Sequence, residues 1–293
     1  MRNLKWIQIY PNVFCVHDGQ EGVVYSPLQG KVFSVSQQGL GIIEDYLSHD
    51  MNPGHQFHSV LEERGFLEPI ELPGVNESEI FDPSDLTLSL TSACNLRCIY
   101  CYADGGVSPK NLLWETIQAS IDLLFHYAIR AGRKYLSISF HGGGEPTVLW
   151  KKLVRAVEYA NGMLTNEQEL SFSLVTNGTL ITPEKAKWLA SNSFALTVSF
   201  DGPEPVQNLQ RPKVQGGGSY SDLVKGIKAL VQAGVNFSLR ATITGNNQHQ
   251  LVEMVRLAHE LGCSSLSVVP FSSTGRGENG IDGVDPQIFV TNY

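Results

Sequence analysis

The chain has 293 residues, of which 42% are hydrophobic and 17% charged, a composition far from that of a disordered chain. Its 21 Lys and Arg against 29 Asp and Glu give a formal net charge of -8, which argues against a broad cationic surface for nucleic acid. No apolar run approaches the roughly 18 residues of a membrane span, and the first residues lack a signal-peptide core. We therefore expect a soluble cytoplasmic protein with neither nucleic acid nor a membrane as partner.

The first part of the chain, residues 1–80, predicts a small α+β domain. Short alternating runs predict strands and two amphipathic segments predict helices. The strands are expected at 6–10, 13–17, 22–26 and 31–34, and the helices at 37–47 and 57–64. Residues 71–79 are acidic and contain proline and glycine, as a linker does. A second domain then covers residues 81–293.

That second domain alternates strand and helix patterns. Strands are expected at 86–91, 135–141, 170–176, 195–199, 237–244 and 265–269. The segments between them have helical periodicity, and one helix begins with Thr182 as N-cap and Pro183 at the first helical position. Strand and helix in alternation imply parallel strands joined by crossovers.

The strands carry polar residues at every second position, as in Ser137, Ser139 and His141. A parallel sheet covered by helices on both faces is usually apolar throughout, so a polar face indicates an interior cavity. We therefore predict an α/β fold, a partial (β/α)6 TIM-like barrel preceded by a small N-terminal winged-helix-like domain. The alternative is an antiparallel sheet with one solvated face, which would not need a helix between nearly every pair of strands.

Three of the five cysteines, Cys94, Cys98 and Cys101, follow the first strand of the predicted barrel in a C-x3-C-x2-C spacing. Loops at the carboxyl ends of barrel strands carry the catalytic residues. Three thiolates can hold three irons of a [4Fe-4S] cube and leave the fourth iron free for a ligand. Zinc is the alternative, and it would need a fourth ligand such as His141.

These cysteines, with the aromatic Tyr100 before the third, resemble the signature of radical S-adenosylmethionine (radical SAM) enzymes, and the resemblance covers roughly residues 85–277. Three further motifs follow successive strands: Gly-Gly-Gly-Glu-Pro at 142–146, Thr-Asn-Gly-Thr at 176–179 and Ser-Phe-Asp-Gly-Pro at 199–203. The resemblance implies a [4Fe-4S] cluster and SAM as cofactors. It also implies that an electron from the cluster cleaves SAM to methionine and a 5′-deoxyadenosyl radical, which takes a hydrogen atom from the substrate.

The resemblance assigns SAM contacts to the motifs. The candidate residues are Tyr100, Gly143, Gly144, Glu145, Asn177, Ser199, Arg211 and Arg240. The glycine segment would hold the methionine amine and Tyr100 would lie against adenine, while Ser199 and Arg211 suit the carboxylate and ribose hydroxyls. Arg240 is a second candidate for the carboxylate; the alternative for it is a structural pair with an acid such as Asp201.

The other two cysteines, Cys15 and Cys263, suit buried structural positions. A sharper hypothesis makes Cys263 a catalytic residue that returns a hydrogen atom to a substrate radical, as radical peptide epimerases require. No cysteine follows Cys263, whereas many family members that modify peptides continue into a cysteine-rich SPASM or twitch region with auxiliary clusters. We therefore expect a truncated or atypical C-terminus.

The motif set, with the segment 270–277, is similar to radical SAM enzymes that modify peptides and proteins. The N-terminal layout resembles the domain that captures leader peptides of ribosomally made, post-translationally modified peptides (RiPPs). The leading hypothesis is therefore a RiPP maturase that forms a crosslink, a thioether or an epimerised centre on a precursor peptide. The alternatives are an enzyme like the anaerobic sulfatase maturases and an iron-sulfur redox sensor without turnover. A flavodoxin or ferredoxin is the expected electron donor.

Overall fold

The computed structural model describes residues 5–69, 83–278 and 280–292. The chain divides into two compact units, Met1–Glu79 and Ile80–Tyr293, and the linker predicted at 71–79 lies outside the described residues. Among the described residues, no helix combines the length and apolar character needed to cross a bilayer. Each unit is described by itself below.

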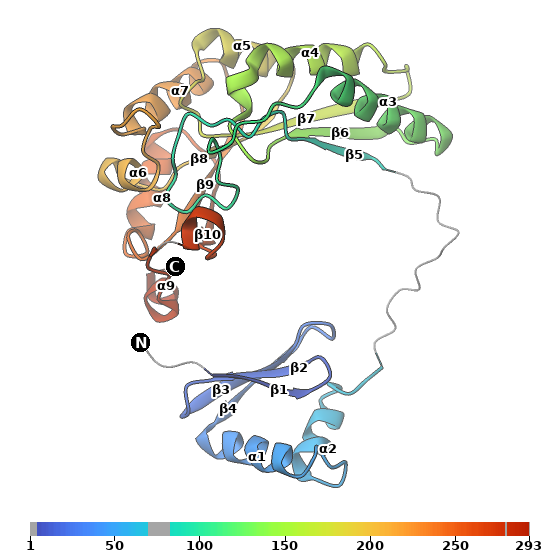
Figure 1. Cartoon of the computed structure of the whole chain (residues 1–293), viewed down its shortest axis with the longest axis vertical. Coiled ribbons are helices and arrows are strands. Elements are labelled where there is room, and N and C mark those ends of the chain that lie inside the picture. The colour runs from blue at the N-terminus through green and yellow to red at the C-terminus, as the bar shows by residue number, and fades with distance from the viewer. Residues whose placement is uncertain (1–4, 70–82, 279, 293) are drawn as a thin grey trace. The chain divides into compact units, whose positions relative to one another are not determined.

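The first unit is a four-stranded antiparallel sheet with two helices, drawn in blue in Figure 1. The strands pair in chain order and the helices follow them: β1 Lys5–Tyr10, β2 Val13–His17, β3 Glu21–Ser26, β4 Lys31–Ser36, α1 Gln37–Ser48 and α2 Gln56–Glu63. Ile9, Val13 and Val24 from the sheet pack with Ile43 and Leu61 from the helices in a core of its own. The two edges of the sheet are β1 and β4.

The second unit is built on a six-stranded sheet whose neighbours all pair in parallel. Its strands are β5 Asp85–Leu88, β6 Tyr135–Phe140, β7 Glu169–Thr176, β8 Ala195–Ser199, β9 Phe237–Ile243 and β10 Leu266–Pro270. The connections contain α3 Trp114–Arg130, η1 Pro146–Leu149, α4 Trp150–Asn161, α5 Pro183–Ser191, α6 Glu204–Gln210, α7 Tyr220–Gln232 and α8 Leu251–Glu260; η2 Gly275–Glu278 and α9 Pro286–Asn292 follow the last strand. The partial-barrel prediction is confirmed, and the antiparallel alternative is wrong.

The two faces of this sheet differ as the alternation predicts. In β6, Leu136, Ile138 and Phe140 are buried, and helices α3, α4, α5 and α7 lie along the outer side of the sheet (Figure 1). On the other face, hydroxyl groups meet across strands, with the Oγ atoms of Ser139 and Ser173 2.7 Å apart. The helices therefore bury the apolar face and leave the polar face to line the interior of the partial barrel.

The first barrel strand is shorter than predicted. It ends at Leu88, because the backbone of the next residues turns to meet the segment before α3: the amide of Leu112 donates to Leu90 O at 2.9 Å, and Thr91 forms an isolated bridge with Asn111. By contrast, the helix start predicted at Thr182 is confirmed, since its side chain accepts from the amide of Lys185 and Pro183 follows at the first helical position. The early end of β5 frees the following loop to cross the carboxyl edge of the sheet.

We predict that two adjacent leucines of α3 differ sharply in their contribution to stability. Leu124 is 2% exposed in the core and Leu123 is 49% exposed. Leu124→Ala should lower the free energy of unfolding by about 2–5 kcal/mol through lost burial and the cavity left behind, and Leu123→Ala by about 0.5 kcal/mol or less. Denaturant unfolding of the two variants measures both; equal effects would show that α3 does not pack on the sheet through this face.

Candidate functional site

The three cysteines lie on one irregular loop at the carboxyl end of β5. Leu96 forms an antiparallel bridge with Lys213, and the amide of Ile99 donates to Gln210 O at 2.9 Å. Within the loop, the Arg97 guanidinium donates to the carbonyl oxygens of Gly105 and Gly106 at 2.8 and 2.9 Å. The loop is thus fixed by backbone pairing to the 210–213 segment and by one internal arginine.

The three cysteines of this loop, residues 94–101, are all half-buried. Burial raises the pKa of Cys98 to about 12, with Asp201, Cys94 and Cys101 adding to the rise and Arg211 acting against it. Burial is also the main reason that the pKa of Cys94 is raised. Because neighbouring thiolates disfavour ionisation of Cys94 and Cys98, a cationic metal cluster bound at this loop would relieve that repulsion.

This donor set fits a [4Fe-4S] cluster. Three thiols stand on one loop, and a cube binds each of its thiolates through a different iron. Among the described residues, no three His, Cys, Asp or Glu side chains are gathered tightly enough to hold a single metal ion. His141, the fourth ligand that the zinc alternative needs, is exposed just after β6.

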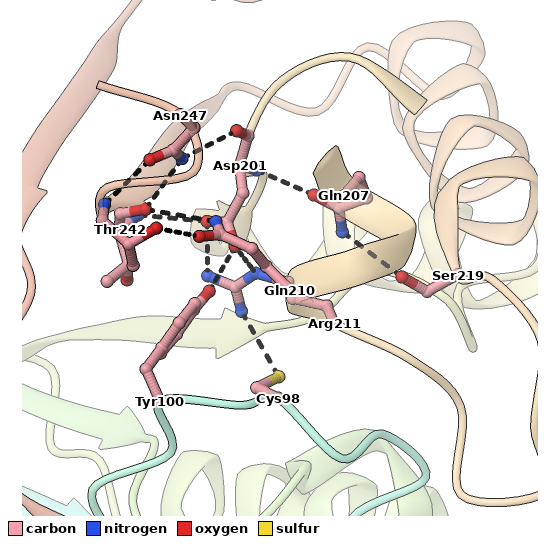
Figure 2. Close-up of polar contacts among 10 residues, drawn as sticks. Cys98, Tyr100, Asp201, Gln207, Gln210, Arg211, Ser219, Thr242 and Asn247 are labelled. Atoms are coloured by element: carbon pink, nitrogen blue, oxygen red, sulfur yellow. Dashed lines mark hydrogen bonds and ion pairs between the residues drawn. The ribbon is translucent and has the colours of Figure 1, made fainter. Parts of the chain in front are cut away.

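The fully buried carboxylate of Asp201 is the centre of the polar network beside the cysteine loop (Figure 2). It accepts from Arg211 twice, with Nε at 2.9 Å and Nη2 at 3.0 Å. It also accepts from Gln210 Nε2 and from the amide of Thr242, each at 3.0 Å, and from the hydroxyl of Tyr100. One carboxylate therefore joins the cysteine loop, α6 and β9.

A second layer of amide side chains holds Asp201 itself. Gln207 Oε1 accepts from the Asp201 amide at 2.7 Å, and Asn247 Nδ2 donates to the carbonyl oxygens of Asp201 and Thr242 at 3.1 and 3.0 Å. Both amide side chains are fully buried. Since buried polar groups are costly unless they are paired, this layer fixes the position of the carboxylate.

Arg211 faces the cysteine loop. Its Nη1 lies 3.9 Å from the Sγ of Cys98, its carbon Cζ lies 5.3 Å from the centre of the Tyr100 ring, and the residue is 8% exposed. Two of its N–H groups are thus used by Asp201, and contact of Arg211 with the SAM carboxylate or ribose stays a prediction.

Tyr100 also differs from its expected use. Its hydroxyl donates to Asp201, and its pKa is raised well above the usual value by burial, to which the Asp201 carboxylate and the Cys98 thiolate add. The hydroxyl is therefore a fixed donor from the cysteine loop to β8. Contact of the ring with adenine stays a prediction.

Glu145 is buried, and its carboxylate accepts four hydrogen bonds from the protein. The donors are the amide and hydroxyl of Thr147, the hydroxyl of Thr176 and the amide of Asn177, at 2.5 to 3.1 Å. The carboxylate thus ties the glycine motif after β6 to the end of β7. These donors use the acceptor positions of the side chain, and contact of the backbone carbonyls of the 143–145 segment with the methionine amine stays a prediction.

The glycines of the 142–146 motif permit close backbone packing against the cysteine loop. A Cβ on Gly144 would lie 2.2 Å from Ala93 O, and one on Gly105 would lie 2.7 Å from Gly143 O. Both distances are shorter than any side chain tolerates. The glycine motif is therefore packed directly on the chain that carries the cysteines.

Asn177 connects the third motif to the same loop. Its Nδ2 donates to Asn95 Oδ1 at 2.9 Å, and Asn95 Nδ2 donates in turn to Thr179 Oγ1 at 2.8 Å. Asn95 lies between the first two cysteines, so the Thr-Asn-Gly-Thr motif and the cysteine motif are joined through one pair of amides.

Ser199 and Arg240 are adjacent on the polar face of the sheet. They are register partners in β8 and β9, and the side chain of Arg240, an exposed residue, has no hydrogen-bond or ion-pair partner among the described residues. Its suggested alternative, a structural pair with Asp201, is wrong because Arg211 holds that carboxylate. A hydroxyl and a free guanidinium side by side suit a carboxylate ligand.

Cys263 lies far from this site in the fold. It precedes β10, and its thiol is within hydrogen-bond distance of the carbonyl oxygens of Phe237 and Ser265, at 3.5 and 3.0 Å. These residues mark the amino ends of their strands, whereas the cysteine loop stands at the carboxyl edge. Hydrogen-atom donation by Cys263 stays a prediction, and Cys15 is buried in the core of the first unit.

Arg276, for which the sequence predicts no individual role, lies in the segment after β10 and contacts the cysteine loop. Its guanidinium donates to the carbonyl oxygens of Cys98 and Gly105 at 2.8 and 3.3 Å and lies 3.5 Å from Asp104. Both residues lie in motifs that were identified from the sequence: Arg276 in the 270–277 segment and Asp201 in the Ser-Phe-Asp-Gly-Pro motif. The sequence carried no signal for the individual partners of these residues.

Comparisons with known proteins agree with this site. The radical SAM superfamily profile matches residues 88–258. The mycofactocin maturase MftC of Mycolicibacterium smegmatis is 31% identical over 70% of this chain and 48% of its own length. A cysteine-type anaerobic sulfatase-maturating enzyme of Clostridium perfringens is 27% identical over 58% of this chain and 46% of its own. The chain thus spans about half the length of these two relatives.

Solved structures show the same fold. The sulfatase-maturating enzyme anSMEcpe with bound AdoMet superposes with a TM-score of 0.58 at 25% identity, over 64% of this chain and 51% of that one. SuiB of Streptococcus suis bound to S-adenosylmethionine gives 0.55 at 15% identity, over 98% of this chain and 70% of that one. The family profile spans more than half of the chain and includes the cysteine loop and the three strand-end motifs, so this chain belongs to the radical SAM superfamily.

Proposed function

We propose that the chain is a radical SAM enzyme that modifies a precursor peptide. The observation that carries the proposal is the arrangement at the carboxyl edge of the sheet. There, three thiols stand on one loop, and each strand-end motif contacts that loop or the residue before it: the Glu145 amide donates to Ala93 O, Asn177 donates to Asn95, and Asp201 accepts from Tyr100. A redox sensor needs the thiols alone, so the strand-end motifs favour an enzyme over a sensor.

Cys94, Cys98 and Cys101 would hold a [4Fe-4S] cluster, and Ser199 and Arg240 would bind the carboxylate of SAM from the polar face of the sheet. When bound, the cluster supplies the electron that cleaves SAM to methionine and a 5′-deoxyadenosyl radical, which takes a hydrogen atom from the substrate. The chain would orient these groups: Glu145 fixes the glycine motif, and the polar face of the sheet would face the substrate. The helices on the outer face exclude water from the other side of the sheet.

A peptide substrate is supported by the relatives, two of which are named maturases. It is also supported by the first unit, whose sheet has β1 and β4 as its edge strands. An extended peptide can add to such an edge through main-chain hydrogen bonds. The proposal is therefore a RiPP maturase that forms a crosslink, a thioether or an epimerised centre, with the first unit as the leader-binding domain.

The second candidate is an enzyme like the anaerobic sulfatase maturases, which the match to the Clostridium perfringens enzyme favours. Either function needs a low-potential electron donor, for which a flavodoxin or ferredoxin is proposed, and free thiols suit the reducing cytoplasm. The two candidates differ in how the substrate arrives, and the second test below separates them.

The first test is SAM cleavage. After anaerobic reconstitution with iron and sulfide, the protein with SAM and a low-potential reductant should form 5′-deoxyadenosine. Cys98→Ala removes one of the three cluster ligands and should lower the yield by at least about a hundredfold, as loss of a group essential to the chemistry does. Chromatographic quantification of the nucleoside measures both, and a loaded cluster without cleavage would instead favour the sensor.

The second test is removal of residues 1–79. The two units have separate cores, so the remaining chain should still assemble the cluster and cleave SAM without peptide. Under the RiPP hypothesis the deletion should weaken binding of a precursor peptide at least about tenfold, because about 1.4 kcal/mol or more of edge contact is lost. Unchanged peptide affinity, measured by fluorescence anisotropy, would favour the sulfatase-maturase candidate.

The third test is Glu145→Gln. The new side-chain amide would place an N–H donor opposite N–H and O–H groups that now donate to the Glu145 carboxylate. The lost hydrogen bonds should lower the free energy of unfolding by about 1–3 kcal/mol. The exposed Glu158 on α4 supplies a matched control, and Glu158→Gln should change stability by about 0.5 kcal/mol or less. Denaturant unfolding compares the two, and faster amide exchange at Asn177 in Glu145→Gln alone would locate the loss. Equal free energies of unfolding for Glu145→Gln and Glu158→Gln would show that Glu145 has no positioning role.

A further inference from the structure

The side chain of Arg211 is the charged group that contacts a cluster-loop thiol directly. Its Nη1 lies 3.9 Å from Cys98 Sγ, while Nε and Nη2 are fixed at 2.9 and 3.0 Å on the two carboxylate oxygens of Asp201. The two hydrogen bonds leave the guanidinium little freedom to rotate, and the ring of Tyr100 lies beside it. The N–H groups of Nη1 are therefore held at the sulfur.

The pair forms an oriented dipole at the proposed cluster. The positive end, on Arg211, faces the Cys98 sulfur, and the negative end, on Asp201, lies behind it (Figure 2). Both residues are buried, at 8% and 0% exposure, so solvent screens their field weakly. Arginine keeps its charge under all ordinary conditions, which makes the positive end permanent.

Such a dipole has a defined effect on a redox group. Adding an electron to an iron-sulfur cluster increases its negative charge, and a positive charge or an N–H donor at a ligating sulfur stabilises the reduced form. The effect of Asp201 on the same equilibrium has the opposite sign. Removing one member of the pair must therefore shift the midpoint potential in one direction, and removing the other must shift it in the reverse direction.

We infer that Arg211 is a positioning residue that raises the midpoint potential of the cluster at Cys94, Cys98 and Cys101, and that Asp201 both orients it and limits the size of the rise. The inference rests on the proposed function, because it assumes that these cysteines hold a [4Fe-4S] cluster. It concerns the cluster alone and requires neither a peptide substrate nor SAM cleavage.

The experiment is a reductive titration of the full chain, reconstituted anaerobically without SAM or peptide. Titanium(III) citrate gives up one electron to become titanium(IV), and the cluster passes from the 2+ to the 1+ state, which is followed by electron paramagnetic resonance. Arg211→Gln should shift the reduction equilibrium about tenfold toward the oxidised cluster, which is about 59 mV for one electron. Asp201→Asn should shift it toward the reduced cluster, because Arg211 then keeps its charge without a counterion.

Arg276 supplies the matched control. Its guanidinium also contacts the cysteine loop, but through the backbone oxygens of Cys98 and Gly105 and from a more exposed position. Arg276→Gln should therefore change the equilibrium less than about twofold, even where it lowers the iron content. A shift as large as that of Arg211→Gln would attribute the effect to loop disorder and overturn the inference.

Equal midpoint potentials in the unsubstituted protein, Arg211→Gln and Asp201→Asn would also overturn the inference, because a merely structural pair alters the cluster content and not its potential.

If Asp201→Asn fails to hold a cluster, Arg211→Lys replaces it in the experiment. Because lysine keeps the charge, its midpoint potential must lie between those of Arg211→Gln and the unsubstituted chain, and any other order overturns the inference. Failure of the unsubstituted protein to assemble a cluster would instead refute the proposed function, so the two failures are distinguishable.

Discussion

The site depends on the buried carboxylate of Asp201. The cysteine loop has no regular secondary structure of its own, and the network around this carboxylate fixes it to the barrel through Tyr100, Arg211 and Gln210. A carboxylate with no exposure would be strongly unfavourable without donors, and here donors from three parts of the chain converge on it. The need to pair the charge therefore brings β8, α6, β9 and the loop together in one arrangement.

Such a pair does not add stability by default. Transfer of two charges from water costs several kcal/mol per ion, and well-packed apolar side chains often replace a buried pair without loss. Asp201 instead fixes the geometry of the site. A carboxylate accepts hydrogen bonds along defined directions, whereas an apolar contact has no preferred direction. Glu145 acts in the same way between β6 and β7, with donors from Thr147, Thr176 and Asn177. Stability comes from the apolar face under the helices, and the carboxylates set where the strand-end loops lie.

Periodicity and motifs were sufficient to predict the strands, their parallel order and the polar interior. Alternation along a strand determines which face is buried, as in Leu136 and Ile138, and this local rule needs no knowledge of distant partners. The strand-end motifs were also visible, because glycine and proline mark turns. In this respect the carboxyl edge of the sheet was predictable from the sequence alone.

The partners of the charged residues were not predictable, because they depend on contacts between distant segments. Both Arg211 and Arg240 were candidates for a ligand carboxylate, and sequence spacing offered no means to separate them. The loop after β8 turns Arg211 back onto Asp201, while Arg240 stays on an exposed position of β9.

The division between the two arginines follows from burial. A guanidinium that binds an incoming ligand must exchange solvent for that ligand, so it must be accessible and without a fixed counterion, as Arg240 is. A guanidinium that acts on a group held permanently by the protein benefits from the opposite conditions, because exclusion of water strengthens its field and a fixed counterion sets its direction. Arg211, at 8% exposure and with Asp201 behind it, meets the second set of conditions. Under the two proposals above, the same side-chain chemistry would serve two purposes in one barrel, and the exposed fraction of each residue would determine which purpose it serves.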